Sequence, residues 1–535
     1  MNIDKIFHVI SDAYARDVEI SVEKPEFSSY PFPQAWKGHN DAIKKILKNK
    51  ISILDFPTGY GKTVVYLTAA KESDLRTIVI VPRNALQDQI RRTYTKMMKI
   101  PILCLYDRVK MCNKGTKPPC LTKFKKNGKW YVKVGDEIVK YPCPDCPYEM
   151  VKAMIKIILR ENKGMAVLNQ GNFWYFKPYA DFIVIDEADE TIKAMVNAVS
   201  YPDVCEEEDP IKVLGWMHDK ISEDIRSIEK CLEKIRGETQ LEYYNAKLKE
   251  LQRKLRKISF FLECPPEKLI TYVRGRTTYV ELFDNPINIA KSLFPHAKIC
   301  LVSATLTNGS GGNYNNNSTN NDNYLYKARV IYAPVGNLSS RNVFVERNYD
   351  LLEKAVEVIV KTYDFTCKLT GMKKAPIHCG NLGKHGLTIY ELLVAGGYEA
   401  VLMEEGNQME AIKQFLQEDV DFLCAVSIEY GFDWSFSPIQ YILKVPFADL
   451  GDPRLRAIKK LLGSKFHEWY NWDALSRLIQ ACGRNSRNPN DFGITIILDS
   501  CFGRLYKRFE DRIPKWFKDR LIWLEENDKG DKNEQ

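Results

Sequence analysis

The stretch Ile51-Ser52-Ile53-Leu54-Asp55-Phe56-Pro57-Thr58-Gly59-Tyr60-Gly61-Lys62-Thr63 decides the fold of this chain. Its first part, Ile51–Phe56, is an apolar run of strand length, and Val64–Lys71 continues the stretch with the composition of a helix. When a loop with small residues joins a buried strand to a helix, several backbone N–H groups converge at the positive end of that helix. The stretch therefore predicts a phosphate-binding loop in an α/β sheet.

The residues expected to bind phosphate in this loop are Thr58, Gly59, Tyr60, Gly61, Lys62 and Thr63. Lys62 would reach the β- and γ-phosphates of ATP, and Thr63 would hold a magnesium ion. The generic pattern has glycine five places before Gly61, where this chain has Phe56.

Length and composition limit the class of protein. A chain of 535 residues is too long for one hydrophobic core, so several domains are expected. Apolar residues make up 45% and charged residues 27%, as in globular proteins, and no apolar run reaches the roughly 18 residues of a membrane span. The start of the chain does not resemble a signal peptide, so we expect an intracellular protein of cellular or viral origin.

Charge and cysteine content add two expectations. The formal net charge of +9 and the pI near 8.7 fit either a phosphate-bearing partner or an ordinary basic surface. The 14 cysteines are mostly scattered singly, which is typical of free thiols in a reducing compartment.

Short apolar runs alternate with helical patterns along the whole chain. Because the runs are apolar at nearly every position, they predict parallel strands buried on both faces, and hence two doubly wound α/β domains. The predicted strands are Ile51–Phe56, Thr77–Pro82, Met165–Asn169, Phe182–Asp186 and Lys298–Ala304 in the first half, and Pro376–Gly380, Glu399–Met403, Phe422–Val426, Tyr441–Val445 and Ile494–Asp499 in the second.

Three segments interrupt this alternation. A heptad-like apolar pattern, broken near Arg236-Gly237-Glu238, predicts two antiparallel helices within residues 203–268. Residues 307–323 are rich in asparagine and predict a disordered loop. The predicted layout is a first α/β domain in residues 1–103, 151–202 and 269–306, a four-cysteine insert in 104–150, the helical insert in 203–268, the asparagine-rich loop in 307–323, and a second α/β domain in 324–535.

Acidic residues follow the buried strand that ends near residue 185. Asp186-Glu187-Ala188-Asp189 places carboxylates at the tip of that strand. A carboxylate there binds magnesium, directly or through water, and the next one polarises the attacking water. We assign Asp186 to the metal and Glu187 to the general base.

Arginines of the second domain complete the set of residues expected at the ATP site. Gln480-Ala481-Cys482-Gly483-Arg484-Asn485-Ser486-Arg487 carries two cations three residues apart, which share one face in a helix. Arg484, Arg487 or both would reach the γ-phosphate from the second domain and stabilise transition-state charge. A basic helix end is the alternative interpretation.

Taken in order, these motifs resemble those of superfamily 2 helicases, and more narrowly of the XPD/DinG branch with an iron–sulfur domain. The match spans about residues 36–500. The stretches that carry it are Pro57–Thr63 (motif I), Val81–Leu86 (Ia), Asp186–Asp189 (II), Ser303–Leu306 (III), Ile428–Asp433 (V), Lys444–Phe447 with Asp452-Pro453, and Gln480–Arg487 (VI).

The resemblance implies two RecA-like domains that bind ATP and magnesium between them and ratchet single-stranded DNA, with 5′ to 3′ movement and unwinding at duplex junctions. It implies a monomeric motor with no membrane partner. It assigns further roles by position: nucleotide binding to Gly431, Asp433 and Gln480, strand contacts to Arg83 and Asn84, and coupling to Ser303, Ala304 and Thr305.

Four cysteines lie between motifs Ia and II with the spacing C-x₇-C-x₂₂-C-x₂-C. They are Cys112, Cys120, Cys143 and Cys146. Their flanks, Arg108 and Pro147-Tyr148, resemble the edges of the cluster domain of XPD-like helicases, which implies an iron–sulfur cluster, 4Fe-4S in that branch. A structural zinc site and unliganded thiols are the alternatives, since only one close pair is present.

The chain departs from the branch in two places. Asp189 stands where the branch has histidine, as in RNA-directed relatives, and the glutamine expected upstream of motif I has only Gln34 or Asn40 as candidates. An RNA helicase, a translocase that does not unwind, and an ATP-gated binding scaffold therefore stay open as alternatives. Lys125–Tyr131 predicts either base-stacking aromatics or a β-hairpin turning at Asn127-Gly128.

Overall fold

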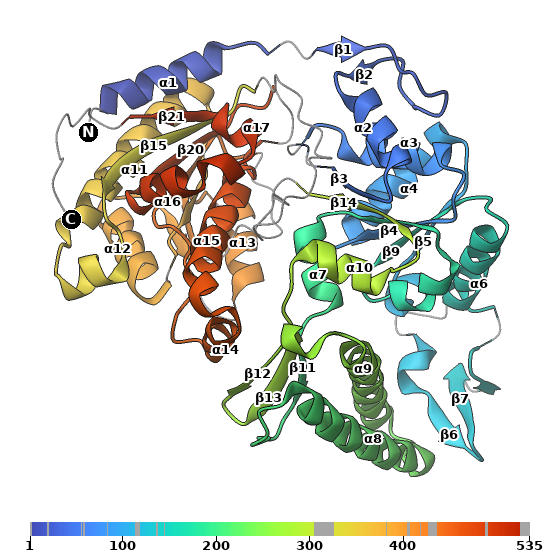
Figure 1. The fold of residues 1–535 in the computed structure, drawn as a ribbon. Helices are drawn as coiled ribbons and strands as arrows, with labels where there is room; N and C mark the ends of the chain where they lie inside the picture. Colours follow the sequence, from blue (N-terminus) through green and yellow to red (C-terminus); the bar gives the residue numbers. More distant parts are fainter. Residues whose placement is uncertain are drawn as a thin grey trace.

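The computed structural model describes residues 3–18, 21–54, 56, 59–82, 84–112, 118–134, 137–143, 145–303, 326–380, 382–403, 407–417, 419–425, 436–486 and 490–524. Figure 1 shows two α/β domains beside each other, with a long helical hairpin and a small strand-rich unit below them.

The first domain is built on a six-stranded parallel sheet. Its strand order is β3-β14-β10-β4-β9-β5, and all neighbouring strands are parallel. Each connection within the sheet is therefore a crossover. The strands are β3 (Ile51–Leu54), β14 (Lys298–Val302), β10 (Phe182–Ile185), β4 (Thr77–Val81), β9 (Met165–Asn169) and β5 (Ile102–Leu105). Five of these are the predicted strands of the first half, with ends within two residues. β5 is an edge strand that the list of apolar runs omits.

The second domain has a seven-stranded parallel sheet. Its strand order is β17-β18-β16-β19-β20-β15-β21. The strands are β17 (Ala400–Leu402), β18 (Phe422–Ala425), β16 (Ala375–His378), β19 (Ile439–Ile442), β20 (Ile494–Asp499), β15 (Arg329–Gly336) and β21 (Leu521–Trp523). The predicted α/β class with two parallel-sheet domains is confirmed, although β19 begins before the predicted Tyr441 and neither β15 nor β21 was predicted.

Helices cover the faces of both sheets. In the first domain they are α2 (His39–Lys48), α3 (Lys62–Glu72), α4 (Asn84–Met98), α6 (Pro147–Arg160), α7 (Ala188–Met195) and α10 (Pro286–Leu293). In the second they are α11 (Asp350–Thr370), α12 (Leu387–Ala395), α13 (Gln408–Gln417), α14 (Pro453–Leu462), α15 (Phe466–Cys482), α16 (Cys501–Phe509) and α17 (Lys515–Lys518). A two-stranded ribbon, β1 (Val22–Glu23) and β2 (Ala35–Trp36), precedes α2.

The N-terminal helix α1 (Ile3–Ala15) packs on the second domain (Figure 1), although residues 1–103 are predicted to belong to the first. Its apolar stripe includes Ile6 and Ile10, which join the core cluster of the second sheet. The ring of Phe7 stacks on that of Phe365 in α11, with 4.4 Å between centroids. An apolar stripe predicts that a helix is packed but does not name its partner.

The helical insert consists of α8 (Pro210–Lys234) and α9 (Glu238–Leu262), two antiparallel helices joined at the predicted break. Asp209 caps α8 by accepting from the backbone N–H of Ile211. Three antiparallel strands lie at the base of the hairpin in the order β11-β13-β12: β11 (Val199–Tyr201), β13 (Thr277–Leu282) and β12 (Leu269–Arg274). The predicted boundary at 268 assigned residues 269–282 to the first α/β domain. They lie instead in this separate three-stranded sheet, called the base sheet below, and not in the six-stranded sheet.

The four-cysteine insert contains a three-stranded antiparallel sheet. Its strands are β6 (Phe124–Lys126), β7 (Lys129–Val134) and β8 (Glu137–Lys140). Asn127 and Gly128 turn the first hairpin with φ of 49° and 71°, the left-handed values of a two-residue hairpin loop. The hairpin predicted there is confirmed. A short helix, α5 (Arg108–Met111), precedes it.

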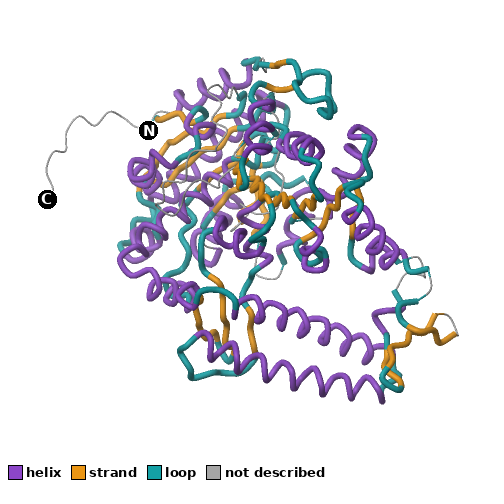
Figure 2. Tube along the Cα trace, turned by 45° about the vertical axis from the view of Figure 1, so that its right-hand side comes forward, coloured by secondary structure: helices purple, strands orange, loops and turns teal. Residues whose placement is uncertain are grey.

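The tip of the helical insert contacts the four-cysteine insert (Figure 2). Asn245 of α9 donates its amide N–H to the carbonyl oxygen of Lys123 at 2.6 Å. Lys125 pairs with Glu229 of α8 at 2.9 Å, and the Arg236 guanidinium lies 4.9 Å from the centre of the Phe124 ring.

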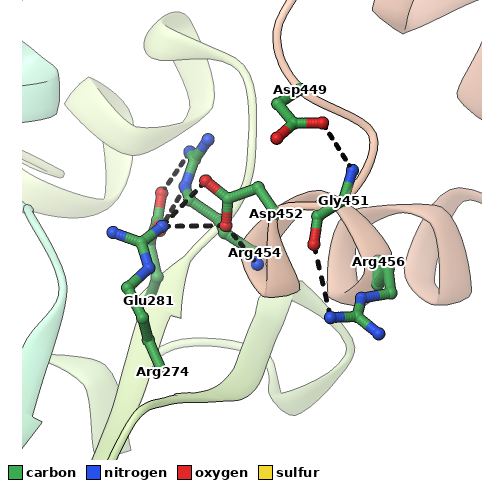
Figure 3. A network of polar contacts seen from close by, with 7 residues as sticks. All are labelled: Arg274, Glu281, Asp449, Gly451, Asp452, Arg454 and Arg456. Carbon is green, nitrogen blue, oxygen red and sulfur yellow. Dashed lines mark hydrogen bonds and ion pairs between the residues drawn. The ribbon is translucent and has the colours of Figure 1, made fainter.

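The base sheet contacts α14 of the second domain (Figure 3). Arg454 forms a two-bond pair with Glu281, and Arg274 donates to both oxygens of Asp452 at 2.8 Å. An apolar cluster lies beside these pairs and joins Ile270 of β12 to Leu455, Ile458 and Phe466 of the second domain. The helical insert is therefore attached at both of its ends.

Candidate active site

The phosphate loop ends in two glycines with left-handed backbone. Gly59 has φ 83° and Gly61 has φ 70°, and Gly61 is the N-cap of α3. A Cβ added at Gly61 would lie 2.9 Å from His39 Cε1, so a side chain is excluded by sterics as well as by conformation. The backbone N–H groups of this turn open onto the positive end of α3, as phosphate binding requires.

Phe56 replaces the generic glycine because its side chain points into the core. Its ring is fully buried and stacks on the imidazole of His39, with centroids 5.6 Å apart. Its carbonyl oxygen accepts from Lys62 Nζ at 3.0 Å. The loop thus uses only the backbone at this position, which explains why a large residue is compatible with it.

His39 hydrogen-bonds to the phosphate loop and holds it in place, although none of the sequence motifs includes this residue. Its Nε2–H donates to the carbonyl oxygen of Tyr60 at 2.9 Å, and its Nδ1 accepts from the hydroxyl of Tyr30 at 2.6 Å. Burial lowers the pKa of His39 to about 4, so the imidazole is neutral near pH 7. The only sequence signal is its place at the first position of helix α2.

Asp186 follows β10 and lies against the phosphate-loop helix. The hydroxyl of Tyr66 donates to its Oδ2 at 3.0 Å, and the backbone N–H of Glu187 donates to its Oδ1 at 2.9 Å. Burial and the neighbouring Glu187 raise the pKa of Asp186, Lys62 and Tyr66 oppose them, and the result is about 6. Lys62 therefore lies near enough to Asp186 to act on its charge.

Glu187 adopts a left-handed backbone conformation, with φ 45° and ψ 56°, at the start of α7. For a residue with a side chain this conformation costs about 1–2 kcal/mol. The conformation turns the chain sharply between the strand tip and the helix, and Thr191 secures the turn by donating its hydroxyl to the carbonyl oxygen of Asp186 at 2.6 Å.

Ser303 and Asp189 join the strand tips of β14 and β10. The Ser303 hydroxyl donates to Asp189 Oδ2 at 2.6 Å, and its backbone N–H donates to the carbonyl oxygen of Leu54 at 3.2 Å. Ser303 is buried, so this contact is shielded from water. The structure therefore brings the predicted coupling residue onto the acidic motif.

In the second domain, Gln480 lies in the last turn of α15 and Arg484 follows its end. The backbone N–H of Arg484 donates to the carbonyl oxygen of Ala481 at 3.1 Å. The next residues are held tightly: Asn485 donates its amide to the carbonyl oxygen of Ile494 at 2.9 Å, and Arg520 donates to the Ser486 hydroxyl at 2.5 Å.

A chain of rings connects the phosphate loop with the second domain. Tyr60 lies 6.1 Å from the buried ring of Tyr326, and the Arg520 guanidinium lies 3.9 Å from the centre of that same ring. One apolar cluster includes Phe56 of the loop and Leu478 of α15. Sequence motifs did not indicate Tyr326 or Arg520.

Several predicted site residues lie outside the described residues. They are Thr58, Arg83, Ala304, Thr305, Gly431, Asp433 and Arg487, together with the asparagine-rich loop 307–323. Asn84, predicted to contact the strand, is the first residue of α4 and is partly exposed. Asn40 is buried and donates its amide to the carbonyl oxygen of Lys24 at 2.9 Å, so its side chain holds the preceding loop.

The four predicted cysteines lie near one another in the insert. Burial raises the pKa of the Cys143 thiol, and Cys146, Cys112 and Cys120 raise it further. Burial also raises the pKa of Cys120, against the effect of Arg108. Arg108 reaches across to α6, pairing with Glu149 at 2.6 Å and lying 4.2 Å from the centre of the Tyr148 ring.

The donor types suit the groups that the motifs imply. The hydroxyl of Thr63 and the carboxylate of Asp186 are oxygen donors, and magnesium is commonly held by one or two such groups plus phosphates and water. Four thiols are the donors of iron–sulfur clusters and of some zinc sites. Among the residues described, no group of three or more His, Cys, Asp or Glu has a metal-holding arrangement. No helix in the same part of the chain is long and apolar enough to cross a membrane.

Two family models match the chain. The DEAD/DEAH box helicase model matches residues 36–201, and the helicase C-terminal domain model matches residues 384–520. The first match includes the phosphate loop and the acidic motif, and the second includes α15 and Arg484.

Among characterised proteins, the chain is similar to a probable ATP-dependent helicase of Methanocaldococcus jannaschii, with 26% identity over 223 residues. The aligned part is 35% of this chain and 33% of that protein, so the chain matches about a third of the length of this relative.

Among solved structures, an XPD helicase superposes with a TM-score of 0.52 at 15% identity, covering 91% of this chain and 98% of that one. Xpd4 of S. tokodaii has a TM-score of 0.49 at 14% identity, covering 91% and 99%. The first of these shows that the chain has the fold of an XPD helicase, with two RecA-like domains. The two family models agree with the resemblance of the motifs to superfamily 2 helicases, and the fold agrees with the XPD branch.

Proposed function

We propose that this chain, which belongs to the superfamily 2 helicases and has the XPD fold, is an ATP-dependent DNA helicase that moves 5′ to 3′ along single-stranded DNA and unwinds duplexes. One observation carries the proposal. Lys62 at the start of α3 lies close enough to Asp186, which follows β10, to lower the pKa of that carboxyl, and the loop is packed against the second domain through Tyr326.

Each residue has a role in hydrolysis. The Lys62 ammonium, held by the Phe56 carbonyl at 3.0 Å, turns to the β- and γ-phosphates when ATP enters. Glu187 accepts the proton of the attacking water. Thr63 and Asp186 would hold magnesium, which would neutralise phosphate charge.

Residues from the second domain complete the ATP site. Arg484 and Arg487 stabilise the charge that develops on the γ-phosphate, and Gln480, Gly431 and Asp433 contact the nucleotide. Because these residues belong to the second domain, hydrolysis follows closure of the interdomain cleft. Ser303, bonded to Asp189 at 2.6 Å, transmits the change from the acidic motif to β14 and on to Ala304 and Thr305.

Arg83 and Asn84 contact the backbone of the DNA strand. Asn84 begins α4, where a helix N-terminus and a cationic neighbour favour phosphate. These contacts carry no base readout, as a motor that moves along any sequence requires.

The four-cysteine insert holds an iron–sulfur cluster, with zinc as the alternative. The effect of Cys146, Cys112 and Cys120 on the pKa of Cys143 supports this, because it places the four thiols near one another and such a cluster takes several cysteine ligands. Protein purified without oxygen is expected to contain iron and to absorb visible light. Loss of both in Cys143→Ser, with wild-type values in Cys231→Ser of the helical insert, would support the cluster, and zinc in place of iron would contradict it.

Strand displacement on duplexes with 5′ or 3′ tails of DNA or RNA tests the main proposal. Wild-type protein should displace the strand of 5′-tailed DNA, and Lys62→Ala should abolish both displacement and hydrolysis. Lys163→Ala, which changes an exposed lysine, is the matched control. Unwinding that persists in Lys62→Ala would refute the mechanism.

A second candidate function is an RNA helicase or a translocase that does not unwind. The observation in its favour is Asp189, which replaces the branch's histidine and bonds Ser303. Preference for RNA tails would favour the RNA helicase. Strand-stimulated ATPase activity without displacement of any duplex would favour the translocase.

A further inference from the structure

Tyr66 lies between the two residues that hold magnesium in the proposed function. It is completely buried on α3, and its hydroxyl donates to Asp186 Oδ2 at 3.0 Å. Thr63 lies three residues earlier on the same helix, hence on the same face, and its side chain lowers the pKa of the Tyr66 phenol. The phenol thus lies beside both Thr63 and Asp186, which are 123 residues apart in the chain.

A phenylalanine would fill the same space without burying a hydroxyl. A hydroxyl removed from water is unfavourable unless it is hydrogen-bonded, so its presence gives no packing advantage. The hydroxyl does constrain Asp186: Oδ2 accepts from Tyr66 and Oδ1 accepts from the Glu187 backbone N–H at 2.9 Å. Each carboxylate oxygen can accept more than one bond, so both retain capacity while their orientation is set.

We propose that Tyr66 is a positioning residue, which holds Asp186 and Thr63 in the relative placement that magnesium-bound nucleotide requires. The inference rests on the proposed function and adds to it a residue that lies outside the motif stretches named above. Tyr66 does not touch the nucleotide. It acts through the two residues that it joins.

Nucleotide binding with and without magnesium tests the inference in Tyr66→Phe. Binding of a fluorescent ADP analogue in EDTA reports the phosphate loop alone, and binding of Mn²⁺, followed by its EPR signal in the presence of ADP, reports the metal residues. Loss of a group that orients a metal ligand lowers metal affinity about 10–100-fold. We therefore expect Mn²⁺ affinity to fall at least about tenfold, with EDTA binding within about twofold of wild type.

Tyr441→Phe is the matched control. Tyr441 is also completely buried, and its hydroxyl donates to the carbonyl oxygen of Ile359 at 3.0 Å, but it lies in the second sheet. Both variants lose a buried hydroxyl, so both should lose thermal stability to a similar degree. Only Tyr66→Phe should lose Mn²⁺ affinity.

The Asp186→Asn background shows whether Tyr66 acts through Asp186. If it does, adding Tyr66→Phe to Asp186→Asn should change Mn²⁺ affinity by less than about twofold, because coupled residues are not additive. Wild-type Mn²⁺ affinity in Tyr66→Phe, or an equal loss in Tyr441→Phe, would overturn the inference and leave the proposed function intact. Failure of the wild-type protein to bind nucleotide and metal would overturn both.

Discussion

Arg454 of the second domain forms a two-bond ion pair with Glu281 of the base sheet, with Nε–Oε2 at 2.7 Å and Nη2–Oε1 at 2.5 Å. The two residues are 173 positions apart, and Glu281 is only 14% exposed. A planar guanidinium paired in this way fixes the relative orientation of the two elements as well as their distance.

Removing one partner of this pair leaves a buried charge. We expect Arg454→Ala to destabilise the protein by about 1–3 kcal/mol, since the carboxylate of Glu281 would lose its donors. Thermal unfolding measures the change. Arg456→Ala is the control, because Arg456 is exposed and its guanidinium donates to the carbonyl oxygen of Gly451 at 3.3 Å (Figure 3). Equal midpoints for the two variants would contradict the role given to the pair.

Gly61→Ala is expected to abolish ATP binding. The new Cβ would lie 2.9 Å from His39 at φ 70°, so both the loop and the histidine must shift. Gly275→Ala separates the effect of backbone strain from that of the clash, since Gly275 has φ 60° but nothing within 4 Å of an added Cβ. That control should lose about 1–2 kcal/mol of stability and keep its affinity for ATP. Titration with a fluorescent ATP analogue decides between the two outcomes.

His39 makes folding stability depend on pH. Burial lowers its folded pKa to about 4, below the ordinary value of 6.5, so in acid the unfolded chain binds a proton before the folded one does. Its contribution is complete above pH 6.5 and is lost as pH falls from 6.5 to about 4, to a total of about 3 kcal/mol.

His39→Gln should therefore show a smaller loss of stability over that range than the wild type does. His296→Gln, at an exposed position, should follow the wild-type curve. Urea unfolding at a series of pH values gives both curves. Parallel curves for wild type and His39→Gln would show that His39 is not the titrating group.

Ser303→Ala should separate hydrolysis from unwinding. The variant loses the bond to Asp189 Oδ2, and a hydrogen bond to a charged group contributes about 1.5–3 kcal/mol. We expect the ATP consumed per base pair unwound to rise about tenfold while ATPase activity stays within threefold of wild type. Ser437→Ala, which removes a buried hydroxyl of the second domain, should leave the ratio unchanged. An unchanged ratio in Ser303→Ala would remove Ser303 from the coupling path.

The sheets and the phosphate loop were predictable because their signals are local. Strands such as β10 and β20 are apolar at most or all positions and buried on both faces, which is what parallel packing requires. β13 was missed for the opposite reason: it alternates between partly buried and buried residues, as an antiparallel strand with one covered face does.

Contacts between distant segments could not be predicted. The pattern of α1 indicates an apolar stripe at Ile6 and Ile10 but not that the stripe lies on the second domain. The bond from Tyr66 to Asp186 spans 120 residues, and nothing in either motif announces it. In the same way, Phe56 departs from the generic glycine of a phosphate loop, and the stacking of its ring on His39, which makes the departure compatible with the loop, could not be predicted.

The helical insert forms a rigid connection between the second domain and the four-cysteine insert, because it is attached at both of its ends. Each of its helices has 25 residues, which corresponds to about 37 Å of rigid length. Because α14 is joined to the base sheet, a displacement of the second domain relative to the first would be transmitted along the helical insert to its tip. The base is held by two arginine–carboxylate pairs and an apolar cluster, whereas the tip is held by Asn245, the Lys125–Glu229 pair and the Arg236–Phe124 contact. We therefore expect closure of the interdomain cleft to change the contacts at the tip, on the four-cysteine insert, before those at the base.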